Sequence, residues 1–170
     1  MIAAIDVRDL LGHPGSSREA RISGTLEDLG TEVAGIPADR PIEGTLLLES
    51  VIEGILVSGH LTGRLQLRCA RCLRDFDAPL AVDVSELFTG APDPEGDDYP
   101  LDPEGSLDPE QMVRDAVGLE LPFSPLHAPD CKGLCDVCGG DRNTGECPGD
   151  HPTVDARWSA LDRVLDRFQN

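Results

Sequence analysis

The spacing of the six cysteines constrains this chain more than any other feature of its sequence. Four of them lie within one stretch of 17 residues: Cys131, Cys135, Cys138 and Cys147. The other two form a separate C-x2-C pair, Cys69 and Cys72. Thiolates two or three residues apart can converge on one tetrahedral ion, because a tight turn brings their sulfurs to the same side. The spacing therefore predicts a structural zinc site.

The six cysteines offer two different sets of four zinc ligands. One set joins two C-x2-C motifs, as in a zinc ribbon: Cys69, Cys72, Cys135 and Cys138. The other set is local to the C-terminal stretch: Cys131, Cys135, Cys138 and Cys147. Loop length does not decide between them, because the entropy cost of closing a loop grows slowly with its length. We favour the paired set, with Cys131 and Cys147 as alternates and the neighbouring His127 and His151 as substitute ligands.

Net charge limits what the chain can bind. It carries 32 acidic residues against 14 lysines and arginines, for a formal charge of −18. Proteins bind nucleic-acid phosphates chiefly through lysine and arginine, so an RNA contact requires a local basic patch or a basic protein partner. One segment without acids offers four arginines: Arg64, Arg68, Arg71 and Arg74. We interpret these four as the RNA or partner contact, and the alternative is that they are solvated surface residues.

Alternating apolar residues predict an antiparallel β-meander of four consecutive short strands between residues 42 and 84. The clearest strand has Leu61, Leu65 and Leu67 on one face and polar side chains on the other. A helix is expected from Asp108, as N-cap, to about Leu121. A second, amphipathic helix is expected near the C-terminus, with an apolar stripe on Trp158, Leu161, Leu165 and Phe168.

These elements predict an α+β fold, mainly an antiparallel β-meander with two helices and a cysteine-rich zinc-knuckle region. Residues 1–90 are expected to form the β-domain that contains the first C-x2-C motif. Residues 91–107 are rich in acids and prolines and are expected to be a flexible loop. Residues 108–170 would then supply the first helix, the zinc-binding segment and a C-terminal helix that packs on the same domain.

The cysteine motifs do not indicate an enzyme. The C-x3-C-x2-C spacing also occurs in radical S-adenosylmethionine enzymes, but only 32 residues follow Cys138, too few for the barrel that they require. A thioredoxin-like redox pair needs a helix after its first cysteine, whereas the residues after Cys72 alternate as a strand that includes Pro79. No phosphate loop, nucleophile–base set or paired-carboxylate site is recognisable, so we expect no catalytic residues and no small-molecule substrate.

The N-terminus has no basic region and no long apolar run, and no stretch approaches the roughly 20 apolar residues of a membrane-spanning helix. We therefore expect a cytoplasmic protein without membrane contact. In that reducing compartment, clustered cysteines favour metal binding over disulfides.

Several motifs, in the same order along nearly the whole chain, resemble one protein family. They are Glu53–Gly59, Cys69–Leu73, Glu86–Phe88, Val113–Val117, Leu121–Pro122, Cys131–Gly139 and Asp155–Trp158. Together they are similar to the YceD family of large ribosomal RNA subunit accumulation proteins, in its Gram-positive, actinobacterial branch. The family's cysteine motif corresponds here to Cys69, Cys72, Cys131, Cys135 and Cys138. The segment Cys147–His151 departs from it, which leaves the fourth ligand of the local set open.

The resemblance implies a cytoplasmic, non-enzymatic ribosome biogenesis factor that supports synthesis, processing or stability of the large-subunit (23S) rRNA. Its expected partner is the large-subunit rRNA precursor or a basic ribosomal protein. A second hypothesis comes from the charge: an acidic zinc-binding adaptor that binds a basic protein partner and does not contact RNA.

Overall fold

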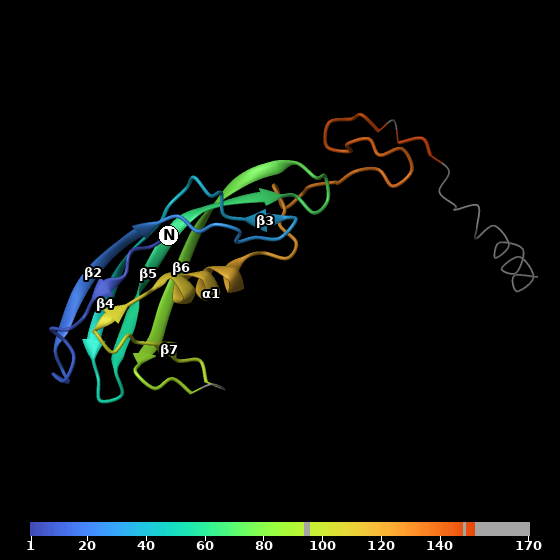
Figure 1. The fold of residues 1–170 in the computed structure, drawn as a ribbon. Coiled ribbons are helices and arrows are strands. Elements are labelled where there is room, and N and C mark those ends of the chain that lie inside the picture. Colours follow the sequence, from blue (N-terminus) through green and yellow to red (C-terminus); the bar gives the residue numbers. More distant parts are fainter. Residues whose placement is uncertain (94–95, 148, 152–170) are drawn as a thin grey trace, which may run out of the picture.

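The computed structural model describes residues 1–93, 96–147 and 149–151, and in this part of the chain strands predominate (Figure 1). The main sheet contains six strands: β2 (Ser17–Gly24), β3 (Ala34–Gly35), β4 (Ile42–Ser50), β5 (Ile55–Arg68), β6 (Asp75–Thr89) and β7 (Tyr99–Pro100). Two further short strands, β1 (Ile5–Asp6) and β8 (Ser106–Leu107), pair with each other. The described residues include one helix, α1 (Glu110–Glu120).

Strands β4, β5 and β6 form an antiparallel meander, and β2 joins it antiparallel on the outer side of β4. The predicted meander is confirmed, but two of its expected short strands are one continuous strand, β5. Glycines explain the difference. Gly59 and Gly63 take core-face positions between the buried Val57, Leu61 and Leu65, so they interrupt the apolar pattern without interrupting the strand.

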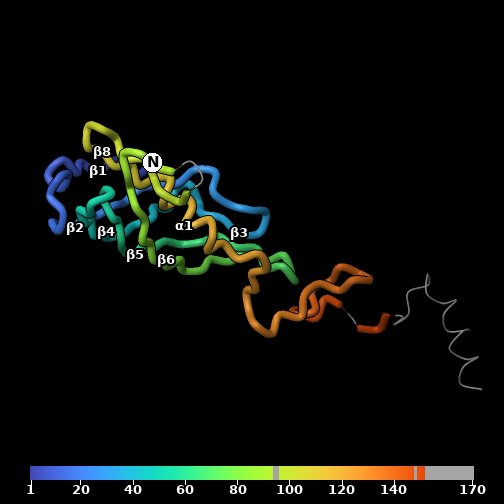
Figure 2. Tube along the Cα trace, turned by 90° about the horizontal axis from the view of Figure 1, so that it is seen from below, coloured from blue at the N-terminus to red at the C-terminus, as the bar shows by residue number. Residues whose placement is uncertain are grey.

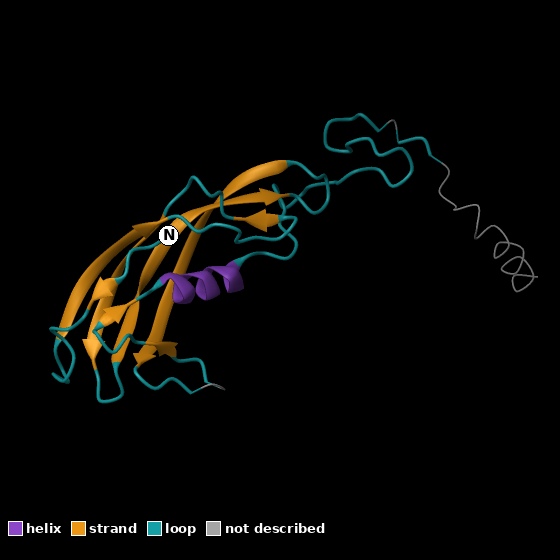
Figure 3. Cartoon of the chain, in the orientation of Figure 1, coloured by secondary structure: helices purple, strands orange, loops and turns teal. Residues whose placement is uncertain are grey.

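The core lies between one face of the sheet and a second layer made by α1 and the N-terminal segment (Figures 2 and 3). Helix α1 buries Met112, Val113 and Val117 and packs chiefly along β6. Among the described residues no segment covers the other face of the sheet, which carries mostly polar side chains. The long β5–β6 hairpin extends past the helix-covered part of the sheet and ends at the first cysteine pair (Figure 1).

Helix α1 ends where its sequence predicts but begins one residue later, with Pro109 as its N-cap and Glu110 as its first residue. The Asp108 carboxylate accepts a hydrogen bond from the Glu110 backbone N–H (3.0 Å), and the helix ends at Glu120, shortly before Pro122. The predicted amphipathic helix near the C-terminus falls in residues 152–170, outside the described residues. No helix in the described residues is long and apolar enough to span a membrane.

Part of the acidic segment 91–107, which the sequence predicts to be a flexible loop, belongs to the sheets instead. Tyr99 and Pro100 pair in parallel with the end of β6, and the ring of Tyr99 stacks on fully buried Phe88 with centroids 5.2 Å apart. Leu101 and Leu107 are buried as well. These few apolar residues among the acids provide enough buried surface to hold the segment against the core.

Candidate metal centres

The first cluster of potential metal ligands lies at the tip of the β5–β6 hairpin. It consists of Cys69, Cys72, His127 and Cys131, whose ligand atoms all lie within 4.8 Å of one another. The Cys69 Sγ and Cys131 Sγ atoms are 3.8 Å apart, and Cys72 Sγ is 3.4 Å from Nδ1 of His127. All three cysteines are buried.

Backbone hydrogen bonds hold the first cluster in place. Within the knuckle, Leu73 N–H donates to the Cys69 carbonyl (2.9 Å), and Cys69 N–H donates to the Arg74 carbonyl (2.8 Å). A further bond from Ala70 N–H to the Pro125 carbonyl (2.8 Å) attaches the segment that carries His127 and Cys131. The end of the hairpin and a segment some 60 residues later are thereby held side by side.

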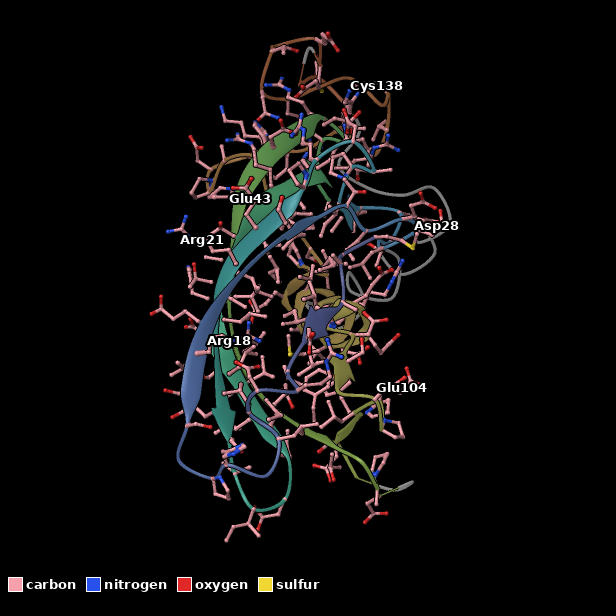
Figure 4. The ribbon with its side chains drawn as sticks, turned by 60° about the vertical axis from the view of Figure 1, so that its left-hand side comes forward. Arg18, Arg21, Asp28, Glu43, Glu104 and Cys138 are labelled. Carbon is pink, nitrogen blue, oxygen red and sulfur yellow. The ribbon has the colours of Figure 1, made fainter. Side chains whose placement is uncertain are left out.

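The second cluster consists of Cys135, Cys138, Cys147 and His151, again with all ligand atoms within 4.8 Å. Its knuckle repeats the hydrogen bonds of the first: Gly139 N–H donates to the Cys135 carbonyl (2.8 Å), and Cys135 N–H to the Gly140 carbonyl (2.9 Å). Cys138, which Figure 4 labels beyond the end of the sheet, is exposed. The second cluster is therefore more accessible to solvent than the first.

The separations between ligand atoms in the two clusters are compatible with a tetrahedral metal site. With Zn–S bonds of about 2.3 Å and Zn–N bonds of about 2.0–2.1 Å, ligand atoms at tetrahedral corners lie about 3.8 Å (S···S) and about 3.5 Å (S···N) apart. The observed Cys69–Cys131 separation is 3.8 Å, and the two sulfur–nitrogen separations, Cys72–His127 and Cys147–His151, are each 3.4 Å. Each cluster, with three cysteines and one histidine, therefore fits a single tetrahedral metal ion.

One thiol in each cluster ionises easily. Burial opposes ionisation of Cys69, but hydrogen bonds from His127 and from nearby backbone N–H groups outweigh it and lower its pKa to about 5. Backbone hydrogen bonds from Cys138 and Val137, with a further contribution from the Arg142 side chain, lower the pKa of Cys135 to about 6. Because zinc binds thiolates, both clusters have a ligand ready at neutral pH.

The two clusters are joined by contacts between their loops. The Arg71 carbonyl accepts a hydrogen bond from Leu134 N–H (3.0 Å), and the Arg71 guanidinium donates to the Cys131 carbonyl (2.8 Å). Asn143 follows Cys138 and precedes Cys147 in the sequence. Its side-chain oxygen accepts a hydrogen bond from Lys132 N–H (2.8 Å), and its amide nitrogen lies 3.6 Å from Cys131 Sγ. The second cluster is thus connected directly to a ligand of the first.

The structure distributes the predicted zinc ligands differently from either set drawn from the sequence. Cys69 and Cys72 lie with Cys131 and His127, whereas Cys135 and Cys138 lie with Cys147 and His151. The expected grouping of Cys69 and Cys72 with Cys135 and Cys138 is therefore divided between two clusters. The sequence contains one signal for this division that neither predicted set uses. Two pairs of one histidine and one cysteine, each four residues apart, flank Cys135 and Cys138 at 127/131 and 147/151, and so supply enough ligands for two sites.

Three of the four arginines predicted to contact RNA or a partner make contacts within the protein. Arg68 pairs with Asp75 (2.8 Å), Arg74 with Asp141 (3.4 Å), and Arg71 binds the Cys131 carbonyl. Arg64 is exposed on β5 and has no hydrogen-bond or ion-pair partner within the described chain. Arg68 and Arg74 keep about half of their side-chain surface exposed.

A strand-rich α+β domain with two Cys3His clusters at one end is thus the class of protein that fold and site define. Residues 57–165 match the family described as large ribosomal RNA subunit accumulation protein YceD, so the chain belongs to this family. The resemblance inferred from its motifs is confirmed.

Mycobacterial proteins are among its relatives. An uncharacterised protein of Mycobacterium tuberculosis and one of Mycobacterium bovis are each 36% identical over 171 residues, covering 95% of this chain and 80% of the relative. An uncharacterised protein of Mycobacterium leprae is 35% identical over 156 residues, covering 83% of this chain and 67% of that protein. No solved structure matches the chain significantly.

Proposed function

We propose that this chain is a non-enzymatic factor that supports the accumulation of large-subunit (23S) rRNA in the cytoplasm, and that two structural zinc ions stabilise it. The observation that carries the proposal is the pair of Cys3His clusters with tetrahedral spacing, found in a member of a family named for this role. Tetrahedral sites of cysteine and histidine suit zinc better than magnesium or calcium, which prefer oxygen ligands.

Zinc in these clusters would have a structural role. Four protein ligands fill a tetrahedral coordination sphere, so no position stays open for a catalytic water. Between Leu121 and His151, the described residues form neither helix nor extended strand, and few of their apolar side chains are buried. Zinc would therefore hold this segment against the tip of the β5–β6 hairpin, where a hydrophobic core is lacking.

Metal content tests the zinc assignment. The zinc-loaded chain, purified under reducing conditions, is expected to hold two zinc ions. The Cys69→Ser and Cys147→Ser variants should each hold one, and the double variant none. His127→Ala should lose or weaken one site, whereas His13→Ala, a histidine outside both clusters, should retain two ions. A wild-type chain with one zinc ion would contradict the assignment, above all if Cys147→Ser retained it.

We place the RNA contact at Arg64 and Arg68, which are exposed on β5. They lie beside the metal clusters on a strand that zinc would hold in place, while Arg71 and Arg74 join the two clusters. We therefore assign phosphate contact to Arg64 and Arg68 and an internal positioning role to Arg71. This division reduces the basic patch predicted from the sequence to the two arginines that make no contact between the two clusters.

Co-sedimentation with large-subunit precursor particles tests the RNA contact. The wild-type chain should sediment with these particles at moderate salt and dissociate as salt rises, because phosphate contacts release counterions. Arg64→Gln combined with Arg68→Gln should abolish the association. Arg8→Gln combined with Arg114→Gln removes the same charge elsewhere and should have no effect. If the wild-type chain never associates with these particles, the proposed function is wrong.

The alternative, an acidic zinc adaptor for a basic protein, is favoured by the charge of −18 and by the internal pairing of Arg68 and Arg74. In that case the particles would bind the Arg64/Arg68 double variant as well as the wild-type chain. Nuclease treatment would also leave the chain attached to a ribosomal protein.

A further inference from the structure

Strand β2 forms an open edge of the main sheet. It is the outermost strand beyond β4, and no other described strand pairs with its outer side (Figure 4). It runs for eight residues, Ser17–Gly24, without proline. A regular edge strand of this length presents a row of unpaired backbone N–H and C=O groups, on which another strand can pair.

The hydrogen bonds beside β2 show which backbone groups face outward. Ser50 N–H donates to the Ser16 carbonyl (2.9 Å), which places Ser16 among the residues that face β4. Backbone groups of successive residues in an antiparallel strand point to alternate sides, so the odd-numbered residues direct theirs outward. They are Ser17, Glu19, Arg21 and Ser23. The N-terminal amine occupies the next outward carbonyl, that of Thr25, so the free edge ends at β2 itself.

The side chains of the same four residues are exposed on the open face of the sheet. Their order, Ser-Glu-Arg-Ser at alternate positions, is complementary to itself when reversed. If a second copy pairs antiparallel around a twofold axis at Ala20, Glu19 lies opposite Arg21 on both sides of the axis, and Ser17 lies opposite Ser23. Moving the axis by one residue places Glu19 opposite Glu19 or Arg21 opposite Arg21, which like-charge repulsion disfavours.

We propose that β2 pairs antiparallel with β2 of a second copy of this chain, with Ala20 on the twofold axis. The two main sheets then form one continuous sheet across a dimer, in which each copy uses the same surface. Arg18, on the core side of β2, adds no unpaired charge to the contact. It binds the Asp6 carbonyl and lies 3.5 Å from the Asp9 carboxylate of its own chain.

Local complementarity matters because the whole molecules repel each other. Each chain carries a charge of −18, so random contacts between copies are disfavoured. At physiological salt, distant charges are screened beyond about 8 Å, whereas directly opposed Glu19 and Arg21 side chains still attract. The charge pattern therefore sets the register of the contact.

Sedimentation equilibrium of the zinc-loaded chain, in reducing buffer at physiological salt, tests the proposal. At concentrations up to about 0.1 mM, the wild-type chain should reach twice its monomer mass of 18.2 kDa. Arg21→Glu and Glu19→Arg each place like charges across the axis and should be monomeric. Glu43→Arg is the control: it makes the same charge change as Glu19→Arg on the same face of the sheet, but on β4, and it should remain dimeric.

An equimolar mixture of the two monomeric variants supplies the decisive measurement. Arg21→Glu presents two acids and Glu19→Arg presents two arginines, so a mixed pair restores both opposite-charge contacts. We expect the mixture to regain the dimer mass, which misfolded variants could not do. A wild-type chain that remains monomeric, a dimer that survives both single reversals, or a mixture that stays monomeric would each overturn the proposal.

Discussion

Leu73 and Gly139 occupy the same position in the two knuckles, directly after the second cysteine of each C-x2-C motif. Both have positive φ, 60° for Leu73 and 72° for Gly139, because the backbone must turn there to bring the two thiols together. Glycine adopts this conformation without strain, whereas for a leucine it costs about 1–2 kcal/mol. The first knuckle therefore stores strain that the second avoids.

Leu73→Gly should stabilise the zinc-loaded protein. The leucine side chain is 57% exposed, so little packing is lost and the relief of strain should dominate, raising the free energy of unfolding by about 1 kcal/mol. Urea unfolding followed by circular dichroism measures the change. Leu73→Ala serves as the control, since alanine keeps the Cβ atom and the strain. A glycine variant no more stable than the alanine variant would show that this position carries no strain.

At the scale of the elements, strand β5 depends on glycines that let neighbouring strands approach. A Cβ atom added at Gly59 would lie 2.3 Å from the Thr45 carbonyl oxygen on β4. No backbone atom can yield at that position without disturbing the β4–β5 pairing, which runs from Glu43↔Thr62 to Ser50↔Ile55. The close pairing of β4 with β5 therefore requires glycine at position 59.

Gly59→Ala should therefore destabilise the sheet, by about 1–3 kcal/mol, as overpacking typically does. Thermal unfolding should show a lower Tm for this variant. Gly90→Ala is a matched control, because a Cβ atom there meets no atom within 4 Å, and its Tm should stay close to that of the wild type. Equal Tm values for the two variants would contradict the tight approach of β4 to β5.

At the scale of the whole molecule, the sheet domain and the metal-cluster end differ in what holds them together. The domain has a continuous hydrophobic core, whereas the described residues of the other end form a small buried cluster around Cys69, Cys72 and Cys131. The stability of the metal-cluster end should then depend on bound metal, and metal binding should depend on ionisation of the thiols. The domain should retain its fold when metal is lost from the other end.

Lowering the pH should release zinc from the second cluster before the first. A thiolate whose pKa is lowered in the folded protein stays ionised until the pH falls through that value. The pKa of Cys69 is about 5 and that of Cys135 about 6, so both thiols are ionised at neutral pH and must take up protons as the pH falls. Cys138 of the second cluster is exposed, whereas the three cysteines of the first are buried, so protons should reach the second cluster first. A chromogenic chelator followed during acid titration should show two steps of one zinc each.

The Cys147→Ser variant shows which cluster releases its zinc in each step. It disables the second cluster, so only the step at lower pH should remain. A single step that releases both zinc ions from the wild-type chain would contradict the predicted order. Zinc loss at the higher pH from the Cys147→Ser variant would contradict it as well.

Local sequence by itself determines several elements of this fold. The alternating leucines of β5, the helix that follows Asp108 and the two C-x2-C motifs each depend on neighbours within a few residues, and the structure contains all three. Periodicity and capping act over such short distances that the chain alone specifies them. The family resemblance also rests on these local motifs.

Only the tertiary structure decided which ligands share a cluster and which arginines stay free. The ligand set of the first cluster depends on contacts between segments about 60 residues apart, such as Ala70 with Pro125 and Arg71 with Cys131, whereas Arg68 pairs with Asp75 across the β5–β6 hairpin. Sequence spacing carries little information on such contacts, because the entropy of closing a long loop hardly distinguishes one partner from another. Packing and hydrogen bonding at the tip of the β5–β6 hairpin made the choice, and so placed His127 and Cys131 beside Cys69 and Cys72.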